Sequence, residues 1–521
     1  MKTRKRGGNR NATPALMVVG TMSHSGKSLA AAALCRYFAR QGIRVAPFKA
    51  QNMALNSFVT REGGEMGRAQ VTQARAAGVE PHTDMNPVLL KPIGNKESQI
   101  IVHGKPVGHR TARQYYRLKK RMQREAWRAY DRLAPQYELM VLEGAGSPAE
   151  INLLDKDFVN LSMAAHARAA VILVADIDRG GVFAGIFGTI MLLPEKYRRL
   201  IRGVVINKFR GDVSLLSPGI RQIERLTGIP VLGVLPFVKD LRLEEEDSLG
   251  LEDRGKKSGP AVLDLAVIRL PRMSNYTDFL ALENTDGVRV RYVDGAEELE
   301  RPDLVILPGT KDTRGDLRWL KTTGMAKAIQ QRVAGRIPLI GICGGFQMLG
   351  RRVRDPSGEE GCPGVEQGLG VLPVDTVFAA GKELAQVEGK TTDDWPFGGA
   401  RRNFSGYEIH MGRTWALAKV RAPLGVLRRG GRSVRELAGV VSSDGLTFGC
   451  YVHGLFDATD LRHDLLRFLC CRKGVRTPKW KEQGEDEVFN RLADLLAKHL
   501  RMDRIERWLG RRSGGKSSRR L

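Results

Sequence analysis

The stretch VVGTMSHSGKS, Val18–Ser28, decides the fold of the first half of this chain. An apolar run ends at Gly20, and a helix-forming run, LAAAALCRYFAR, follows Ser28. Glycines at both ends of such a loop let the backbone approach a phosphate, while a lysine adds positive charge and a serine offers its hydroxyl to Mg²⁺. The common pattern is G-x-x-x-x-G-K-[ST], and here five residues instead of four lie between the glycines. The loop predicts an ATP site, with a glycine-rich turn that binds nothing as the alternative. Its expected ATP-binding residues are Gly20, Thr21, Gly26, Lys27 and Ser28.

Polar residues that end other apolar runs extend this predicted site. Glu143 lies directly after the run YELMVL and before Gly-Ala-Gly, a position that packing explains poorly. Ligands bind at the carboxyl edge of a parallel sheet, so Ser28 and Glu143 are expected to hold Mg²⁺. Asp157 and Asp176 are weaker candidates for the same metal, and Asn207 in INKFRGD suits recognition of adenine.

Short apolar runs alternate with helical stretches along the chain. In the first half they are ALMVVG, IRVAPFKA, YELMVLEG, AAVILVADID, IRGVVINKF and IPVLGVLPF. Such runs are typical of parallel strands buried on both faces, and the helical stretches between them predict a doubly wound α/β sheet. A segment rich in charge, glycine and proline interrupts the pattern at 240–260, and LDLAVIRL, VRVRYVD, DLVILPG, IPLIGIC and TFGCYVHGLF follow it.

The sequence therefore predicts two α/β domains. The predicted division is a basic tail at 1–15, a first domain at 16–240, a linker at 241–260, a second domain at 261–510 and a basic tail at 511–521.

The stretch IPLIGICGGFQMLG, 337–350, predicts a nucleophilic cysteine. Small residues around Cys343 allow a sharp strand-to-helix turn, and a helix N-terminus lowers the pKa of a thiol. The backbone at Gly309 and Gly344 is expected to bind a developing oxyanion. His453, at the end of an apolar run, is the expected general base. A buried structural cysteine is the alternative, but it leaves the flanking glycines without a purpose.

Composition narrows the class of protein. The 521 residues exceed the ~250–300 that one hydrophobic core supports, so two or more domains are expected. The sequence contains no run of ~18 apolar residues, so no transmembrane helix is expected. The six cysteines lack a paired spacing, which predicts a reduced, cytoplasmic protein. The formal net charge is +27. We expect most of this charge on solvated surfaces and tails, with attraction of a polyanionic small substrate as the alternative. No nucleic-acid or membrane partner is expected, and the oligomeric state is not indicated.

Both predicted sites resemble known families. The longer phosphate loop is similar to that of dethiobiotin synthetase and its relatives, and the Cys343–His453 arrangement resembles the class I glutamine amidotransferase domain. The resemblance implies that Cys343 forms a glutamyl thioester and releases ammonia. The family's third catalytic residue, a Glu two positions after the histidine, is replaced here by Leu455. We therefore expect a Cys–His dyad without an orienting carboxylate.

Longer stretches resemble the glutamine-dependent amidases of the cobalamin pathway. They are FKAQNMALNS, EGAGSPAEINL, DIDRGGVFA, NKFRGD, RLPRMSNYTDF, GYEIHMGRT and YVHGLFD, and the similarity runs from residue 16 to residue 509. The resemblance implies a carbon–nitrogen ligase that uses ATP, Mg²⁺ and glutamine. Its implied reaction is amidation of four peripheral carboxylates (b, d, e, g) of adenosylcobyrinic acid a,c-diamide, giving adenosylcobyric acid. The residues expected to line the corrinoid site are Lys49, Gln51, Asn52, Asp157, Tyr276, Tyr407 and Glu408, together with Ser274, Asn275, Asp278 and His410 from SNYTD and GYEIH.

Two other functions stay open on the sequence. One is a sister amidase of the cobyrinic acid a,c-diamide synthase type, from which AQNMALNS and SPAEINL would distinguish this chain. The other is a partition-type, DNA-associated ATPase, which shares an unusual phosphate loop but needs neither Cys343 nor His453. Its DNA binding would weaken steeply with salt.

Overall fold

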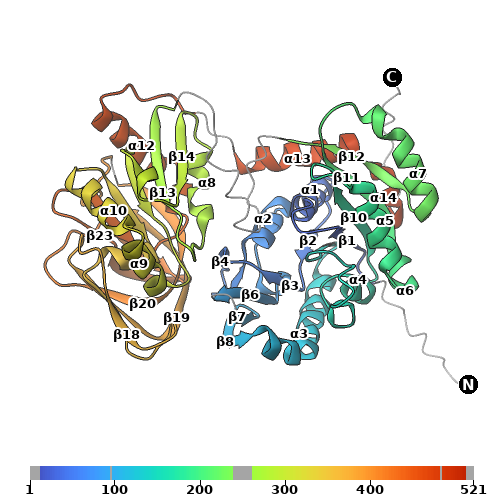
Figure 1. Cartoon of the computed structure of the whole chain (residues 1–521), viewed down its shortest axis with the longest axis horizontal. Helices are drawn as coiled ribbons and strands as arrows, with labels where there is room; N and C mark the ends of the chain where they lie inside the picture. Colours follow the sequence, from blue (N-terminus) through green and yellow to red (C-terminus); the bar gives the residue numbers. More distant parts are fainter. Residues whose placement is uncertain (1–11, 94–96, 239–260, 400, 481–483, 512–521) are drawn as a thin grey trace, which may run out of the picture.

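The computed structural model describes residues 12–93, 97–238, 261–399, 401–480 and 484–511. The predicted linker at 241–260 and most of both predicted basic tails lie outside these residues. Figure 1 shows two lobes, one formed mainly by the first half of the chain and one by the second half.

The first lobe is centred on a parallel six-stranded sheet with strand order β12-β11-β10-β1-β9-β2. Every run that the first half predicts as a strand takes part in it. The strands are β1 (Ala15–Gly20), β2 (Val45–Phe48), β9 (Leu139–Glu143), β10 (Ala170–Asp176), β11 (Ile201–Phe209) and β12 (Val231–Pro236).

Both faces of this sheet are buried, which explains why its strands are apolar at nearly every position. Along β1, Met17 and Val19 join one hydrophobic cluster, whereas Leu16 and Val18 join another on the opposite face. The alternation follows from the two-residue period of a strand. The helices of this lobe are α1 (Lys27–Ala39), α2 (Arg68–Ala77), α3 (Ala112–Leu133), α4 (Leu161–Ala167), α5 (Val182–Leu192), α6 (Glu195–Arg198) and α7 (Ser217–Thr227).

The last two helices, α13 (Glu485–His499) and α14 (Met502–Trp508), pack on the first lobe (Figure 1). Phe489, Leu492 and Leu496 join the cluster that also contains α1, and Arg36 Nε donates to Asn490 Oδ1 at 2.8 Å. These apolar side chains cover a face of α1 that would otherwise be exposed to water. The sequence groups residues 261–510 in one unit, whereas the contacts of these helices lie with the first half of the chain. The predicted domain limits themselves stay a prediction.

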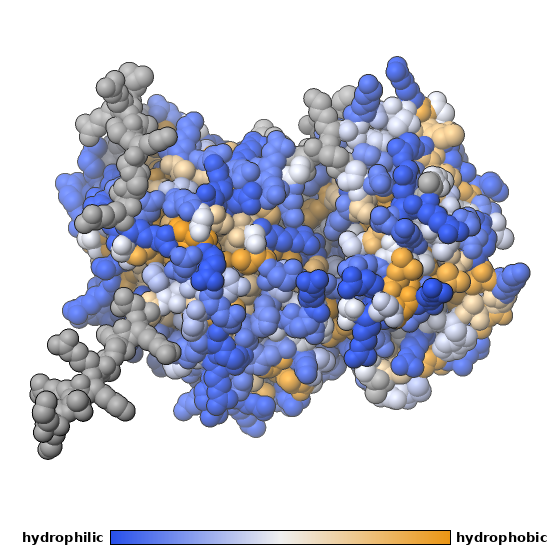
Figure 2. Space-filling view, turned by 180° about the vertical axis from the view of Figure 1, so that it is seen from behind, coloured by the Kyte–Doolittle hydropathy of each residue, from blue (hydrophilic) through white to orange (hydrophobic). Residues whose placement is uncertain are grey.

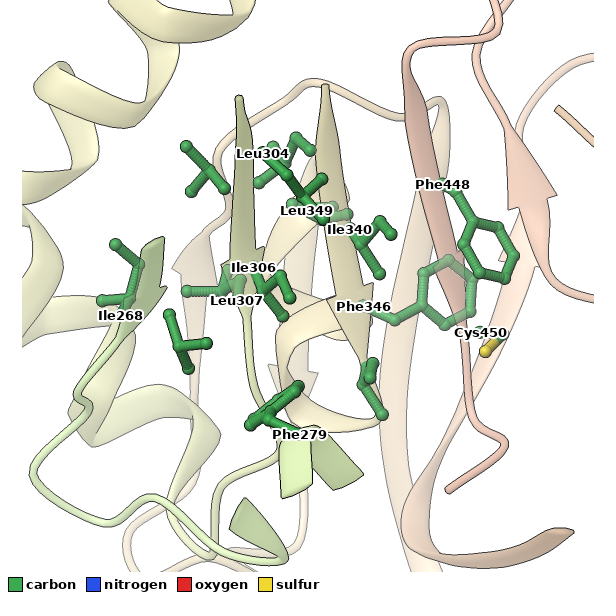
Figure 3. Close-up of a cluster of buried hydrophobic side chains, with 14 of the residues drawn as sticks. Ile268, Phe279, Leu304, Ile306, Leu307, Ile340, Phe346, Leu349, Phe448 and Cys450 are labelled. Carbon is green, nitrogen blue, oxygen red and sulfur yellow. The ribbon is translucent and has the colours of Figure 1, made fainter. Parts of the chain in front are cut away.

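The second lobe contains another six-stranded sheet, with strand order β14-β13-β15-β16-β24-β23, in which only β23 runs antiparallel. Its strands are β13 (Leu263–Ile268), β14 (Val288–Val293), β15 (Leu304–Leu307), β16 (Leu339–Ile342), β23 (Val440–Val441) and β24 (Thr447–Cys450). Its helices are α8 (Leu280–Glu283), α9 (Thr313–Thr322), α10 (Met325–Ala334), α11 (Gly344–Leu349) and α12 (Thr459–Lys473). Figure 3 shows the buried side chains of this sheet meeting Phe346 and Leu349 of α11.

A further sheet lies within residues 352–438, between the runs IPLIGIC and TFGCYVHGLF, where the sequence predicts no strand. Its strand order is β18-β17-β19-β21-β22, and β20 pairs with β19. Its strands are β17 (Arg352–Asp355), β18 (Gly364–Gln367), β19 (Val374–Thr391), β20 (Asn403–Ala416), β21 (Leu424–Arg429) and β22 (Arg432–Ala438). Many of its side chains are polar on one face, as expected of antiparallel strands exposed to water on one side.

Small strands of the first lobe lie toward the second lobe (Figure 1). They form a four-stranded sheet, β3-β6-β7-β8, and a ribbon of β4 and β5. The strands are β3 (Gln51–Met53), β4 (Ser57–Val59), β5 (Glu65–Gly67), β6 (Val88–Ile93), β7 (Glu97–Val102) and β8 (Lys105–Thr111).

The β4–β5 ribbon fastens the two lobes together. The Glu65 carboxylate is fully buried and accepts from Lys91 Nζ at 2.8 Å and from Lys382 Nζ, in the second lobe, at 2.5 Å. Gln386 Nε2 of the second lobe donates to the carbonyl oxygen of Val59 at 3.0 Å. A buried carboxylate between two lysines is strongly held, because removal of any one partner leaves an uncompensated charge in the interior.

The outer surface is mostly hydrophilic on the face that Figure 2 shows, with apolar patches scattered over both lobes. Over the described ranges, no helix is both long enough and apolar enough to cross a membrane.

We expect Leu492→Ala to destabilise the first lobe by about 2–5 kcal/mol, because it opens a cavity in the cluster that joins α13 to α1. The measurement is urea denaturation together with hydrogen exchange of the α1 amides. Leu226→Ala is the control: this α7 leucine is 53% exposed, so its loss should cost within about 0.5 kcal/mol. Undiminished protection of α1 in Leu492→Ala would contradict the packing of α13 on this lobe.

Candidate functional site

The loop between β1 and α1 has the backbone geometry that the glycine pattern predicts. Gly26 lies in the left-handed region, with φ of 96°, immediately before α1. A Cβ on Gly20 would lie 2.2 Å from Ser25 Oγ, so a larger residue cannot occupy that position without movement of the loop. Ser25 Oγ is buried and has no hydrogen-bond partner among the described residues. A buried hydroxyl of this kind, inside a glycine loop before a helix, fits a bound phosphate.

Glu143 ends β9 and meets this loop, with its carboxylate completely buried. Oε1 accepts from Ser28 Oγ at 2.7 Å and from Lys49 Nζ at 3.1 Å, and Oε2 accepts from Gln73 Nε2 at 2.5 Å. Burial opposes the charge, but Lys49, Ser28 and Gln73 outweigh it and hold the pKa of Glu143 below its usual value. Ser28 and Glu143 therefore present two oxygen donors side by side, and this pair fits the donor chemistry that Mg²⁺ prefers.

Asn207 and Lys208 hold the phosphate loop from β11. Asn207 Nδ2 donates to the carbonyl oxygen of Ser25 at 2.9 Å, and Lys208 Nζ donates to that of His24 at 2.8 Å. Lys208 also pairs with Asp176 at 2.8 Å. In this structure the Asn207 amide thus contacts the loop backbone, and its predicted contact with adenine stays a prediction. Asp176 is engaged by Lys208 rather than by Ser28 or Glu143.

The predicted substrate residues of the first half lie in different surroundings. Lys49 is bound to Glu143, and Asn52 Nδ2 donates to Gln70 Oε1 at 3.0 Å. Gln51 accepts a hydrogen bond from the Tyr115 hydroxyl. Asp157 accepts from the backbone of Val159 at 2.8 Å, at the turn that leads into α4. Lys49 and Asn52 thus belong to the surroundings of Glu143, and Asp157 lies on a turn that Asn160 joins to Ala145, two residues after Glu143.

Cys343 sits on the sharp turn between β16 and α11. Its φ of 53° and ψ of −111° are unusual for a residue with a side chain. A Cβ on Gly345 would lie 1.9 Å from the carbonyl oxygen of Leu307, so the flanking glycine lets the turn press against β15. The Cys343 thiol lies 3.3 Å from the carbonyl oxygen of Ile409. Strain at a nucleophile on such a turn is a frequent property of catalytic sites.

His453 faces Cys343 and is held by Asp278, a carboxylate that the sequence predicts in the corrinoid site and not at this centre. His453 Nδ1 lies 2.7 Å from Asp278 Oδ2, and Gly454 N–H donates to Asp278 Oδ1 at 3.0 Å. Burial favours the neutral ring, but Asp278 and Cys343 outweigh it and raise the pKa of His453 to about 10. The expected dyad without an orienting carboxylate is therefore wrong. Asp278 partners His453 from a segment 175 positions earlier in the chain.

Backbone groups surround the reactive thiol. A Cβ on Gly309 would lie 3.1 Å from His453 Cε1 and 3.6 Å from Cys343 Cβ, and a Cβ on Gly344 would lie 3.1 Å from Thr310 N. Gly344 is the first residue of α11, so its N–H has no acceptor within that helix. The structure thus brings Gly309 and Gly344 together beside Cys343, and their role as oxyanion donors stays a prediction.

A cavity of ≈ 50 Å³ lies against Cys343. It is lined by residues of the second lobe and by Lys91 of the first lobe. Lys311 and Glu360, both in the lining, are charged groups that the sequence did not single out. Burial and the nearby Lys382 lower the pKa of Lys311 to about 7, and burial raises the pKa of Glu360 to about 7.

Tyr276, Tyr407 and Glu408 are buried near the junction of the lobes, with exposed fractions of 1%, 2% and 3%. The Tyr407 ring stacks on His453 with centroids 5.3 Å apart, and Glu408 pairs with Arg429. Their proposed contact with a large substrate stays a prediction, and in this structure they contact the glutaminase-like centre or neighbouring side chains.

Comparisons with known proteins match two family models along this chain. Residues 16–250 match the model of the CobQ/CobB/MinD/ParA nucleotide binding domain, and residues 264–461 match that of the CobB/CobQ-like glutamine amidotransferase domain. The chain is 48% identical over 501 residues to a protein of Klebsiella pneumoniae (strain 342) named cobyric acid synthase, covering 95% of this chain and 97% of that protein. A protein of the same name from Moorella thermoacetica is 47% identical over 503 residues, covering 95% of this chain and 97% of that protein.

We expect Asp278→Asn to slow alkylation of the Cys343 thiol by iodoacetamide by about tenfold at neutral pH, because the neighbouring imidazolium loses its stabilising charge. In the unaltered protein the imidazolium should persist to about pH 10, and in the variant it should be lost at lower pH. The measurement is the pH profile of alkylation, followed on the Cys343 peptide by mass spectrometry. Asp286→Asn, at an exposed position in the same region, is the control. An identical profile for Asp278→Asn would mean that the carboxylate does not act on the centre.

Proposed function

The chain belongs to the cobyric acid synthase family, and we propose that it amidates the b, d, e and g carboxylates of adenosylcobyrinic acid a,c-diamide to give adenosylcobyric acid. ATP and glutamine are the co-substrates of this reaction. The observation that carries the proposal is similarity of 47–48% identity along 95% of the chain, through both the phosphate loop and the Cys343 turn. A cytoplasmic location fits this chemistry and stays a prediction.

The second lobe would supply ammonia. The Cys343 thiolate attacks the amide carbon of glutamine, and the N–H groups near Gly309 and Gly344 face the oxygen that becomes negative. His453 donates its proton to the leaving nitrogen, so ammonia departs and a glutamyl thioester remains. Water, which gives a proton to the now neutral His453, then cleaves the thioester, so glutamate departs and the thiolate and the charged histidine are restored. Asp278 holds His453 in orientation and stabilises its charged form throughout.

The first lobe would activate the acid. Lys27 and the loop backbone bind the phosphates, and Ser28 with Glu143 would hold Mg²⁺, which neutralises phosphate charge when bound. The terminal phosphate passes to a corrinoid carboxylate, and ammonia displaces it to form the amide. Lys49 pairs with Glu143 at 3.1 Å, so its positive charge would help to stabilise the negative charge of the phosphate that is transferred.

The direct test is mass spectrometry of adenosylcobyrinic acid a,c-diamide incubated with the protein, glutamine and Mg-ATP. Four successive conversions of carboxylate to amide are expected. Conversion of cobyrinic acid alone would favour the sister diamide synthase. Absence of any amidation, with tight and salt-sensitive DNA binding, would favour a partition-type ATPase.

Cys343→Ala should reduce glutamine-dependent amidation by at least about 10³-fold, because the nucleophile is lost. Amidation with ammonium salts should stay within about twofold of the unaltered enzyme, because only the nitrogen source is affected. Both rates are measured with the same corrinoid. If ammonium salts fail to restore activity, the two-site mechanism is wrong.

Lys27→Ala should reduce amidation with both nitrogen sources by at least about 10²-fold, since phosphate binding and charge stabilisation are lost. Glutamine hydrolysis without corrinoid serves as the control for folding of the second lobe. Unchanged amidation would remove the phosphate loop from the mechanism.

A further inference from the structure

A short segment of the first lobe reaches the glutaminase centre of the second. Asn56 Oδ1 accepts from the backbone N–H of Tyr276 at 3.1 Å, and the N–H of Ser57 donates to Asn275 Oδ1 at 3.0 Å. Asn56, Asn275 and Tyr276 are 2%, 3% and 1% exposed, so these bonds lie in the interior. Two chain segments more than two hundred residues apart are thus joined by paired hydrogen bonds.

The second-lobe residues in these bonds support the catalytic histidine. Asn275 Nδ2 is 3.4 Å from His453 Nε2, the ring nitrogen opposite the one that contacts Asp278. Asn275 has φ of 53°, in the left-handed region, and Tyr276 begins the turn that carries Asp278. A non-glycine residue in this region persists when its surroundings fix it, and the bonds from Asn56 and Ser57 provide such fixation.

The same segment also supports the other side of His453. Phe58 packs on Tyr407 with ring centroids 5.0 Å apart, and Tyr407 stacks on His453. The backbones of Tyr407 and His453 exchange hydrogen bonds at 2.9 and 3.2 Å. Residues 56–58 therefore contact the residues that support His453 on two sides, namely the Asn275–Asp278 turn and Tyr407.

The segment leads without interruption to the ATP site. The carbonyl oxygen of Asn56 accepts from Arg68 N–H, the first residue of α2, at 3.3 Å. Gln70 and Gln73 of that helix donate to Glu143 at 3.4 and 2.5 Å. Helix α2 therefore contacts the ATP site, and residues 56–58, which are bonded to it, contact the supports of His453.

We propose that Asn56 is a positioning residue through which the first lobe holds the Asn275–Asp278 turn and orients His453 for glutamine hydrolysis. This inference rests on the proposed function of the Cys343 centre. Asn56 acts through the Tyr276 amide and does not touch glutamine. The second lobe alone lacks this contact, so its catalytic turn depends on the docked first lobe.

Two substitutions at Asn56 separate the hydrogen-bond acceptor from the volume of the side chain. Asn56→Leu removes the acceptor and should lower kcat for glutamine hydrolysis by about tenfold or more, with a smaller effect on KM. Asn56→Asp keeps an oxygen acceptor and should recover most of the lost rate. Ammonia-dependent amidation should stay within about twofold in both variants, because neither substitution removes the backbone hydrogen bond that links residue 56 to α2.

Thr60→Val is the matched control. Thr60 is a buried polar residue in the same ribbon, and its hydroxyl bonds only locally with Gly64. It should lower stability slightly and leave kcat for glutamine unchanged.

Each outcome decides the proposal. Unchanged glutamine hydrolysis in Asn56→Leu, or an equal loss of glutamine- and ammonia-dependent rates, would overturn it. Equal losses in Asn56→Leu and Asn56→Asp would exclude the acceptor role. If Asn56→Leu does not fold, two other measurements decide. Slow hydrogen exchange of the Tyr276 amide in the unaltered protein, together with retained glutamine hydrolysis in Asn56→Asp, supports the contact. Rapid exchange of that amide rejects it. Glutamate release needs no corrinoid, so failure of the corrinoid assignment is distinguishable from failure of this role.

Discussion

The buried Glu65 carboxylate is the interaction on which the arrangement of the two lobes depends. Lys91 comes from its own lobe and Lys382 from the other, and Ser57 Oγ donates to the same carboxylate at 2.8 Å. Burial disfavours the charged carboxylate, but Lys382 and Lys91 hold the pKa of Glu65 far below its usual value. An ion with these partners is stable in only one geometry, because each displaced lysine would leave a charge unpaired in the interior. The contact therefore fixes where the β4–β5 ribbon meets the second lobe.

Both centres use the same structural principle. Each lies where parallel strands end at their carboxyl edge, since the loops there are free of the sheet's own hydrogen bonding. In the first lobe the edge presents a glycine loop and Glu143, and in the second it presents Cys343. The two sheets are separate, so phosphate transfer and thiol attack take place at different sites. Helix α2 contacts Glu143 at the first site, and residues 56–58 contact the residues that support His453 at the second.

The second lobe decides between an amidase and a partition-type ATPase. The family model matched by residues 16–250 covers MinD and ParA proteins as well as CobQ and CobB, so the phosphate loop alone does not discriminate. The strained Cys343 turn with the His453–Asp278 pair has no use in an ATPase that only switches partners. Triad geometry of this kind, found by role and not by position in the sequence, is typical of nucleophilic catalysis.

The sequence by itself determined the parallel strands of both six-stranded sheets, the phosphate loop and the Cys343 turn, because each depends on residues within one short run. The periodicity of apolar residues and the spacing of glycines depend only on neighbouring residues, so both can be recognised in the sequence alone. Only the tertiary structure decided that Asp278 partners His453, that Glu65 binds Lys382, and that α13 covers α1. Asp278 and His453 lie 175 positions apart, and Glu65 and Lys382 lie 317 positions apart. No sequence pattern in one segment identifies its partner in the other. The packing of the sheets and the ribbon brings these residues together. A buried charge is costly unless it is paired, so the charged side chains that meet in the interior form the pairs.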